Sequence, residues 1–138
     1  MVRINLIVPT KLADQHLIAE YNEILMLLGY VRKYPSKEDI PKDYCLGRGH
    51  IKFFKDKLLY LKKRHETIKK EMIKRGFTPT KKVILLDYSP TLRNDWKPKA
   101  ADYKLIKVRL SEKISKKPSY YRYYGENKDV TFFLDLLN

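Results

Sequence analysis

The residues best suited to chemistry lie close to the start of the chain, on a segment that is otherwise rich in apolar residues. They follow the charged start Met1-Val2-Arg3 and are Gln15, His16, Glu20 and Glu23. A carboxylate inside an apolar helix, close in sequence to a free amine and an arginine, suggests chemistry at the chain terminus. His16 and Glu23 are seven residues apart, so they share one face of a helix.

A helix has to position these side chains, and the spacing of apolar residues predicts one over residues 11–28. Thr10 is the expected N-cap, and Gly29 is expected to end the helix in a left-handed conformation. Residues 30–47 contain two prolines and a glycine and are predicted to form a loop.

Two more helices are predicted downstream. An apolar stripe predicts a helix over residues 49–75, about 40 Å long, that ends at Gly76. The third is predicted over residues 99–117, with Pro98 suited to its first turn. Between them, residues 83–86 fit either a short strand or a buried extended connector. We therefore predict an all-α fold, a compact single domain of three main helices joined by long loops.

Length and charge narrow the class of protein. A chain of 138 residues forms one domain and buries roughly two-thirds of its unfolded surface. Thirty Lys and Arg against sixteen Asp and Glu leave a net charge of +14, far more than solubility requires. A polyanion is the expected partner. No apolar run of membrane-spanning length and no signal peptide is apparent, so we expect no membrane partner and a cytoplasmic protein, nucleoid-associated or virus-encoded and acting in a host cell.

The cysteine and histidine pattern gives no sign of a metal site. Cys45 is the only cysteine, so no intrachain disulfide can form, and a small buried hydrophobe is its expected role. His16, His50 and His65 lack zinc-like spacing with Cys45, so we expect no metal. His50 is expected to be a structural residue at the start of the second helix.

The positive charge is patterned along the third helix and the segment after it. Arg109 and Lys113 lie at i and i+4 on one helix face, and Lys117 extends the same basic stripe, which can follow phosphates. The tyrosine-rich segment 118–125 follows. In it we expect Tyr120, Tyr121 and Arg122 to contact nucleic acid, and Tyr123 and Tyr124 to cap the core. Most lysines of the second helix are expected to form its solvated face.

The chain contains short sequence blocks that occur in the same order and at closely similar spacing in a known protein family. The resemblance covers nearly the whole chain. The blocks are Met1–Leu6, Leu12–Glu23, Leu46-Gly47, Gly49-His50, Phe53-Phe54, Asp56–Leu58, Lys74–Phe77, Arg109-Leu110, Glu112–Ile114, Pro118, Tyr121 and Tyr123–Gly125. In these blocks the chain resembles the phage-type endonuclease V family of pyrimidine-dimer DNA glycosylases. The resemblance implies a compact helical fold with the N-terminal segment threaded between helices.

The resemblance also implies a reaction. Family members excise ultraviolet-induced pyrimidine dimers and then cleave the backbone, using the α-amino group of the residue after the initiator Met, here Val2. An α-amino group has a pKa of about 8 against about 10.4 for lysine, so it is the readier nucleophile. A Schiff base forms, β-elimination follows, and no cofactor is needed. Glu23 matches the catalytic carboxylate, and Glu20 is the expected structural acid.

The resemblance further implies DNA-contacting positions. It carries them over to Arg3, Gln15, His16, Asn22, Arg109 and Lys113, with Arg32 and Lys33 as weaker matches. The implied partner is double-stranded DNA bent at a lesion with one nucleotide turned out of the stack, bound by a monomer. At Asn22 and Met26, however, the family usually has phosphate-binding arginines. Because both charges are missing, other functions stay open. The protein could act on a different damaged base, act on abasic sites alone, or be a non-catalytic nucleic-acid-binding module.

The chain end exceeds the usual family length. We divide the sequence into a glycosylase-like domain, residues 1–125, and an extension, residues 126–138. A short terminal helix packed on the domain explains its apolar residues. The alternative is that Val130–Leu137 docks in the groove of a partner such as a sliding clamp.

Overall fold

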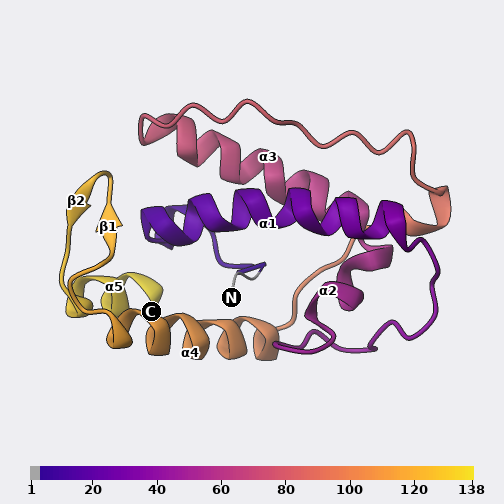
Figure 1. Ribbon diagram of the computed structural model, residues 1–138. Coiled ribbons are helices and arrows are strands. Elements are labelled where there is room, and N and C mark those ends of the chain that lie inside the picture. The colour runs from indigo at the N-terminus through magenta and orange to yellow at the C-terminus, as the bar shows by residue number, and fades with distance from the viewer. Residues whose placement is uncertain (1–3) are drawn as a thin grey trace.

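A computed structural model describes residues 4–138 and shows a helical protein, which confirms the all-α prediction (Figure 1). The helices are α1 (Asp14–Lys33), α2 (His50–Phe53), α3 (Leu58–Lys74), α4 (Ala100–Lys116) and α5 (Val130–Leu137). Short 3₁₀ turns span Pro9–Lys11, Phe54–Asp56 and Pro90–Leu92. In Figure 1, α1 lies between α3 and α4, and the N-terminal segment lies between α1 and α4.

The first helix begins and ends later than the sequence predicts. Pro9–Lys11 forms a separate 3₁₀ turn, so Thr10 is not an N-cap, and Ala13 takes that position without a side-chain hydrogen bond. At the other end the helix passes through Gly29 and continues to Lys33. Leu28 and Val31 are buried on either side of Gly29, and their packing outweighs the roughly 1 kcal/mol that glycine costs inside a helix.

The helix predicted over residues 49–75 is broken. Phe54–Asp56 is a 3₁₀ turn, and Lys57 leaves the helical region with φ −123° and ψ 41°. The backbone of Lys57 forms an isolated β-bridge with Arg93, a long-range pairing that apolar periodicity does not reveal. The predicted stop at Gly76 is confirmed: its φ is +93°, and the Phe77 amide donates to the Met72 carbonyl over 2.9 Å.

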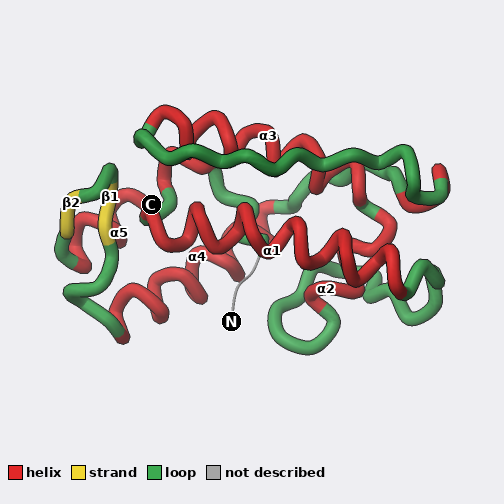
Figure 2. The backbone as a smooth tube through the Cα atoms, turned by 45° about the horizontal axis from the view of Figure 1, so that its top comes forward, coloured by secondary structure: helices red, strands yellow, loops and turns green. Residues whose placement is uncertain are grey.

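The remaining elements follow the predictions more closely. The third predicted helix, α4, begins and ends within one residue of the expected bounds. The segment after α3 runs back along that helix as a loop (Figure 2). Residues 83–86 form no strand there. Val83 and Leu85 are buried while Ile84 and Leu86 are exposed, so this segment is an extended connector. A small hairpin that the sequence does not predict pairs Arg122–Tyr123 with Glu126–Asn127.

The core joins both ends of the described chain. Ile4, Leu6 and Ile7 are each less than 5% exposed, and they share the core with the inward faces of the long helices. Phe133 and Leu137 of α5 are buried in the same core, and α5 contacts α4 and the Pro9–Lys11 turn. A terminal helix packed on the domain is therefore observed, and two of the apolar residues considered for a partner groove are already covered.

Within residues 4–138, none of the helices combines the length and the apolar composition needed to cross a bilayer.

Candidate active site

The N-terminal segment is fixed by side chains from the loop before α2 and from α2 itself. The Ile4 amide donates to His50 Nε2 over 3.0 Å, and the Ile4 carbonyl accepts from the Tyr44 hydroxyl over 3.0 Å. His50 Nδ1 lies 2.8 Å from the Cys45 carbonyl oxygen. His50 is thus a structural residue, as the sequence predicts. The role of Tyr44 has no signal in the sequence, because it depends on a contact between residues 40 positions apart.

A buried ion pair fixes the same segment further along. Arg64 of α3 forms two hydrogen bonds to the Glu20 carboxylate, at 2.6 and 3.0 Å, and a third to the Ile7 carbonyl at 2.6 Å. The Arg64 side chain is 6% exposed and that of Glu20 is not exposed. Glu20 is therefore a structural acid, as predicted. Its pairing also places the N-terminal segment against the face of α1 that carries Glu20.

Glu23 lies one turn after Glu20 on α1 and is 9% exposed, at the boundary between the interior and solvent. Side chains three residues apart on a helix lie on the same side, so Glu23 lies on the side of α1 that carries Glu20, whose partner Arg64 holds Ile7. Asn22 is exposed and Met26 is 69% exposed. The surface beside Glu23 therefore presents two uncharged side chains.

His16 lies two turns before Glu23, between α1, α4 and the tyrosine-rich segment. Its ring is 4.7 Å from that of Tyr121. Burial, and to a smaller extent the charge of Lys113, lowers the pKa of His16 to about 4, so the imidazole is neutral at physiological pH. Among residues 4–138, its Nε2 atom has no hydrogen-bond partner and does not reach solvent. Contact between this nitrogen and DNA would need a local rearrangement.

Gln15 is used to hold the segment that follows α4. Its side-chain amide donates to the Tyr120 carbonyl over 2.8 Å and accepts from the Arg122 amide over 3.0 Å. Beside it, the Asp14 carboxylate accepts from the amides of Tyr124 and Gly125. These bonds join the N-terminus of α1 to the hairpin. Gln15 therefore positions the tyrosine-rich segment, and its contact with DNA stays a prediction.

Arg75 is a central residue that the sequence analysis missed. Its side chain is fully buried and forms ion pairs with Asp14 and Glu71, at 3.0 and 2.8 Å. The guanidinium carbon also lies 4.6 Å from the Tyr123 ring centroid and 5.0 Å from that of Tyr124. Arg75 thus links the end of α3, the start of α1 and the hairpin. Only its place before Gly76 marks it in the sequence.

The tyrosines of this segment differ from the prediction in part. Tyr121 is 7% exposed and packs against Phe133, so its ring is part of the core and is not presented for stacking on bases. Tyr124, assigned to the core, is 41% exposed, and its hydroxyl donates to Glu71. Tyr124 has a φ of +53° and lies at the turn of the hairpin, where its side chain is partly in solvent. Tyr120 and Arg122 are exposed, as a nucleic-acid contact requires.

The predicted phosphate-binding cations lie on two elements. Arg109 and Lys113 are half-buried on α4, Lys117 is exposed just after it, and Arg32 and Lys33 are exposed at the end of α1. Lys113 is close enough to His16 to affect its pKa. Lys33 is seventeen residues from His16, about 25 Å along a helix, so these cations suit an extended polyanion and not one small ligand. Val2 and Arg3 lie outside the described residues.

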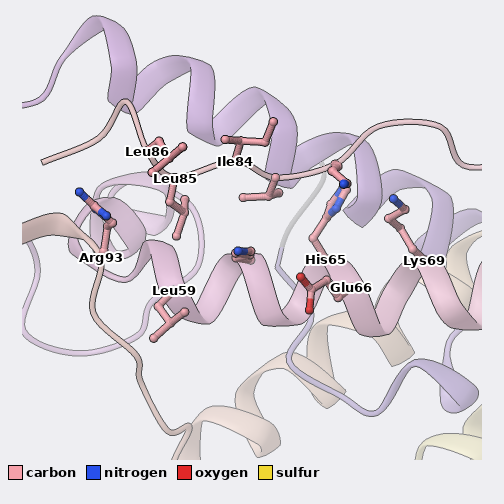
Figure 3. Close-up of a pocket in the computed structure, with 11 residues that line it drawn as sticks. Leu59, His65, Glu66, Lys69, Ile84, Leu85, Leu86 and Arg93 are labelled. Atoms are coloured by element: carbon pink, nitrogen blue, oxygen red, sulfur yellow. The ribbon is translucent and has the colours of Figure 1, made fainter. Parts of the chain in front are cut away.

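A separate hollow of about 540 Å³ lies between α3 and residues 82–86 (Figure 3). Its basic lining residues are Lys62, Lys69, Lys82 and Arg93, against one acid, Glu66. His65 forms part of the wall and stacks on Tyr21, with ring centroids 4.7 Å apart. Burial, followed by the charge of Lys69, lowers the pKa of His65 to about 4. None of the residues lining this hollow belongs to the Glu23 site, so it is a second cationic surface.

The residues that build this site lie in a part of the chain that matches a known protein family. The sequence model of one family, described as pyrimidine dimer DNA glycosylase, matches residues 1–85. This range includes the N-terminal segment, all of α1, the Tyr44 and His50 contacts to Ile4, and the Arg64–Glu20 pair. The match therefore covers more than half of the chain, including Glu23, the Arg64–Glu20 pair and the residues that hold Ile4.

Proposed function

This chain belongs to the pyrimidine dimer DNA glycosylase family, and we propose that it excises ultraviolet-induced cyclobutane pyrimidine dimers and then cleaves the abasic site through the α-amino group of Val2. Family membership makes the protein a DNA glycosylase of DNA repair. The lyase step and the nucleophile are the proposal. They are supported by one observation: the N-terminal segment is fixed at Ile4 and Ile7, and Arg64 ties Ile7 to Glu20, one turn before Glu23 on the same side of α1.

The fixed point at Ile4 limits where the proposed nucleophile can be. The Val2 nitrogen is two residues before the Ile4 nitrogen, and an extended chain covers at most about 7 Å over two residues. Covalent geometry alone therefore keeps the amine within that distance of the Ile4 nitrogen. An α-amino group with a pKa of about 8 is partly neutral at physiological pH, so it can attack without a strong base.

The proposed reaction balances without a cofactor. The neutral amine attacks C1′ of the damaged nucleotide, the glycosidic bond breaks, and the base leaves with the bonding electron pair and gains a proton. Opening of the sugar ring gives a protonated imine at C1′, which acidifies the C2′ proton. Removal of that proton breaks the C3′–O bond and expels the 3′ phosphate. Water then hydrolyses the imine and regenerates the amine.

Glu23 is the proposed acid–base residue. Its position beside the N-terminal segment suits a carboxylate that stabilises the cationic imine and moves protons in the elimination step. Backbone phosphates would be bound by the half-buried Arg109 and Lys113 of α4 and by the exposed cations at the end of α1. The neutral His16 would lie beside the site. In this proposal the bound DNA is bent and one nucleotide leaves the stack, which a dimer makes easier because it weakens pairing and stacking.

A second candidate keeps the chemistry but changes the lesion. Asn22 and Met26 remove two positive charges beside Glu23, and Met26 exposes an apolar side chain there. A weaker hold on phosphates around a dimer favours action on another damaged base or on abasic sites alone, because an existing abasic site needs no base removal.

Strand cleavage by Glu23→Gln tests the proposal. We expect this variant to cleave both a thymine-dimer duplex and an abasic duplex at least about 100-fold more slowly than wild type, the usual size of a general acid–base contribution. Glu38→Gln, an exposed residue in the loop after α1, is the control and should cleave both at the wild-type rate. Cleavage of only the abasic duplex by wild type would favour the second candidate. Equal rates for Glu23→Gln and wild type would contradict the role of Glu23.

A further inference from the structure

The hydrogen bonds to Ile4 form a clamp on the N-terminal segment, made by the side chains of Tyr44 and His50. The two side chains are 6% and 3% exposed, and they satisfy the carbonyl and the amide of the same residue. A donor and an acceptor on one residue fix both its position and the rotation of its peptide planes. The clamp therefore fixes Ile4, the first residue that the structure describes.

The protonation pattern of the clamp is determined by its partners. The Ile4 amide can only donate, so His50 Nε2 must offer a lone pair. The proton of the neutral ring then lies on Nδ1, which donates to the Cys45 carbonyl. His50 is thus held at both ring nitrogens, as a residue with a positioning role needs to be.

The clamp rests on a rigid support. Tyr44 and His50 each pack edge-on against Phe54, which is fully buried. The loop between them turns tightly at Gly49, where φ is +93° and an added Cβ would lie 3.3 Å from both Cys45 and Pro41. A side chain at this position would strain the loop. The loop before α2 is therefore built to hold Tyr44 and His50 in one arrangement.

The effect of the clamp on the reaction can be estimated from chain length. Without the bonds to Ile4, the next hydrogen-bonded anchor is Ile7, held by Arg64. Five residues separate Val2 from Ile7, so the reach of the amine would rise from about 7 Å to about 17 Å. The accessible volume grows as the cube of the reach, roughly 15-fold. The rate of attack follows the local concentration of a correctly placed amine. Because core packing also holds Ile4, about tenfold is the largest loss expected when both bonds are removed.

We propose that Tyr44 and His50 are positioning residues, which hold Ile4 so that the α-amino group of Val2 is presented to C1′ of the bound sugar. This inference rests on the proposed function, because it assumes that the Val2 amine is the nucleophile. It assigns to the loop before α2 a part in the reaction, although neither side chain touches the reacting atoms.

Single-turnover borohydride trapping on an abasic duplex tests this clamp. Tyr44→Phe removes one hydroxyl and leaves the ring, and His50→Gln keeps an acceptor and a donor while His50→Leu removes both. Tyr88→Phe is the matched control, because its hydroxyl also donates to a backbone carbonyl, that of Leu28 over 2.9 Å, and is also buried. Tyr44→Phe and His50→Leu each remove one of the two bonds to Ile4. We expect trapping to fall severalfold in each, and by no more than about tenfold, less in His50→Gln, and not in Tyr88→Phe.

Two further measurements separate positioning from folding. Affinity for a duplex with a non-cleavable tetrahydrofuran abasic analogue should stay within about twofold of wild type. Reductive methylation of the Val2 amine in the absence of DNA should be at least as fast as in wild type, because a released amine keeps its nucleophilicity.

The possible outcomes are distinct. If wild type forms its adduct through Val2 but the clamp variants trap at the rate of Tyr88→Phe, the clamp proposal is wrong and the proposed function stands. If wild type forms no adduct through Val2, both are wrong. A parallel loss of trapping, DNA affinity and thermal stability would mean that the two residues serve folding alone.

Discussion

Several buried polar residues of this protein form hydrogen bonds that hold its N-terminal segment. Tyr44 and His50 hold Ile4, while Arg64 holds Ile7 and neutralises Glu20. A buried carboxylate that loses its guanidinium partner costs about 3–5 kcal/mol, so the Arg64–Glu20 pair is a condition for this fold. At the scale of single residues, buried hydrogen bonds to Ile4 and Ile7 hold the segment that leads to the proposed nucleophile.

The buried histidines make stability depend on pH. The pKa of His65 is lowered to about 4, chiefly by burial, against about 6.5 in the unfolded chain, so the unfolded state binds more protons between these two values. The stabilisation is complete above pH 6.5 and is lost as the pH falls toward 4. His65→Phe keeps a flat ring against Tyr21 but cannot bind a proton. Between pH 7.5 and pH 5 we predict that its free energy of unfolding falls by about 2 kcal/mol less than that of wild type.

Urea unfolding of both proteins at the two pH values measures this effect. His16 has a similarly lowered pKa and leaves part of the pH dependence in the variant. Identical losses in wild type and His65→Phe would show that His65 is protonated without cost in the folded protein.

At the scale of elements, local signals predicted the fold only where no distant contact opposed them. Apolar spacing and flanking prolines located α4 to within one residue, and Gly76 ended α3 as expected. The break at Lys57 and the hairpin after Arg122 were missed, because they depend on backbone pairing with residues elsewhere in the chain. Gly29 was predicted to end a helix, but the buried residues around it carry the helix past it.

The two helix-associated glycines give a direct test of this account. Gly29 lies inside α1 with no atom within 4 Å of an added Cβ, while Gly76 has a φ of +93°. We predict that Gly29→Ala stabilises the protein by about 0.5–1 kcal/mol, because alanine loses less backbone entropy in a helix. Gly76→Ala should destabilise it by about 1–2 kcal/mol, because the left-handed conformation is costly for alanine. Denaturant midpoints of the two variants check both signs, and equal signs would contradict the assignment.

At the scale of the molecule, a net charge of +14 is spread over α4, the end of α1 and the hollow beside α3. The charge and most of the helical segments could be predicted from the sequence, while the role of Glu23 stays a prediction that rests on the family resemblance. The clamp on Ile4, the Arg75 links and the burial of Tyr121 could not, because each joins residues that are far apart in the chain. A basic composition predicts a polyanion, but it does not say which cations are at the site.

Restoring a charge beside Glu23 tests whether DNA lies there. Met26 is 69% exposed, and Met26→Arg should add one phosphate contact and steepen the dependence of log K on log salt concentration by about 0.9 for duplex DNA. Ile73→Arg is the matched control. Ile73 is 61% exposed on α3, and this substitution gives the protein the same net charge as Met26→Arg. Binding titrations at several salt concentrations measure both slopes. Equal steepening in the two variants would show that only total charge matters and that DNA does not lie over α1 at Met26.

The central claim is that the chain terminus is the nucleophile, and the most direct measurement is the identity of the nitrogen that forms the imine. Wild-type protein is trapped with borohydride on an abasic duplex, digested, and the site of the sugar adduct is located by mass spectrometry. The account predicts the adduct on the α-nitrogen of Val2, with Met1 removed. An adduct on a lysine side chain, or none, would contradict it.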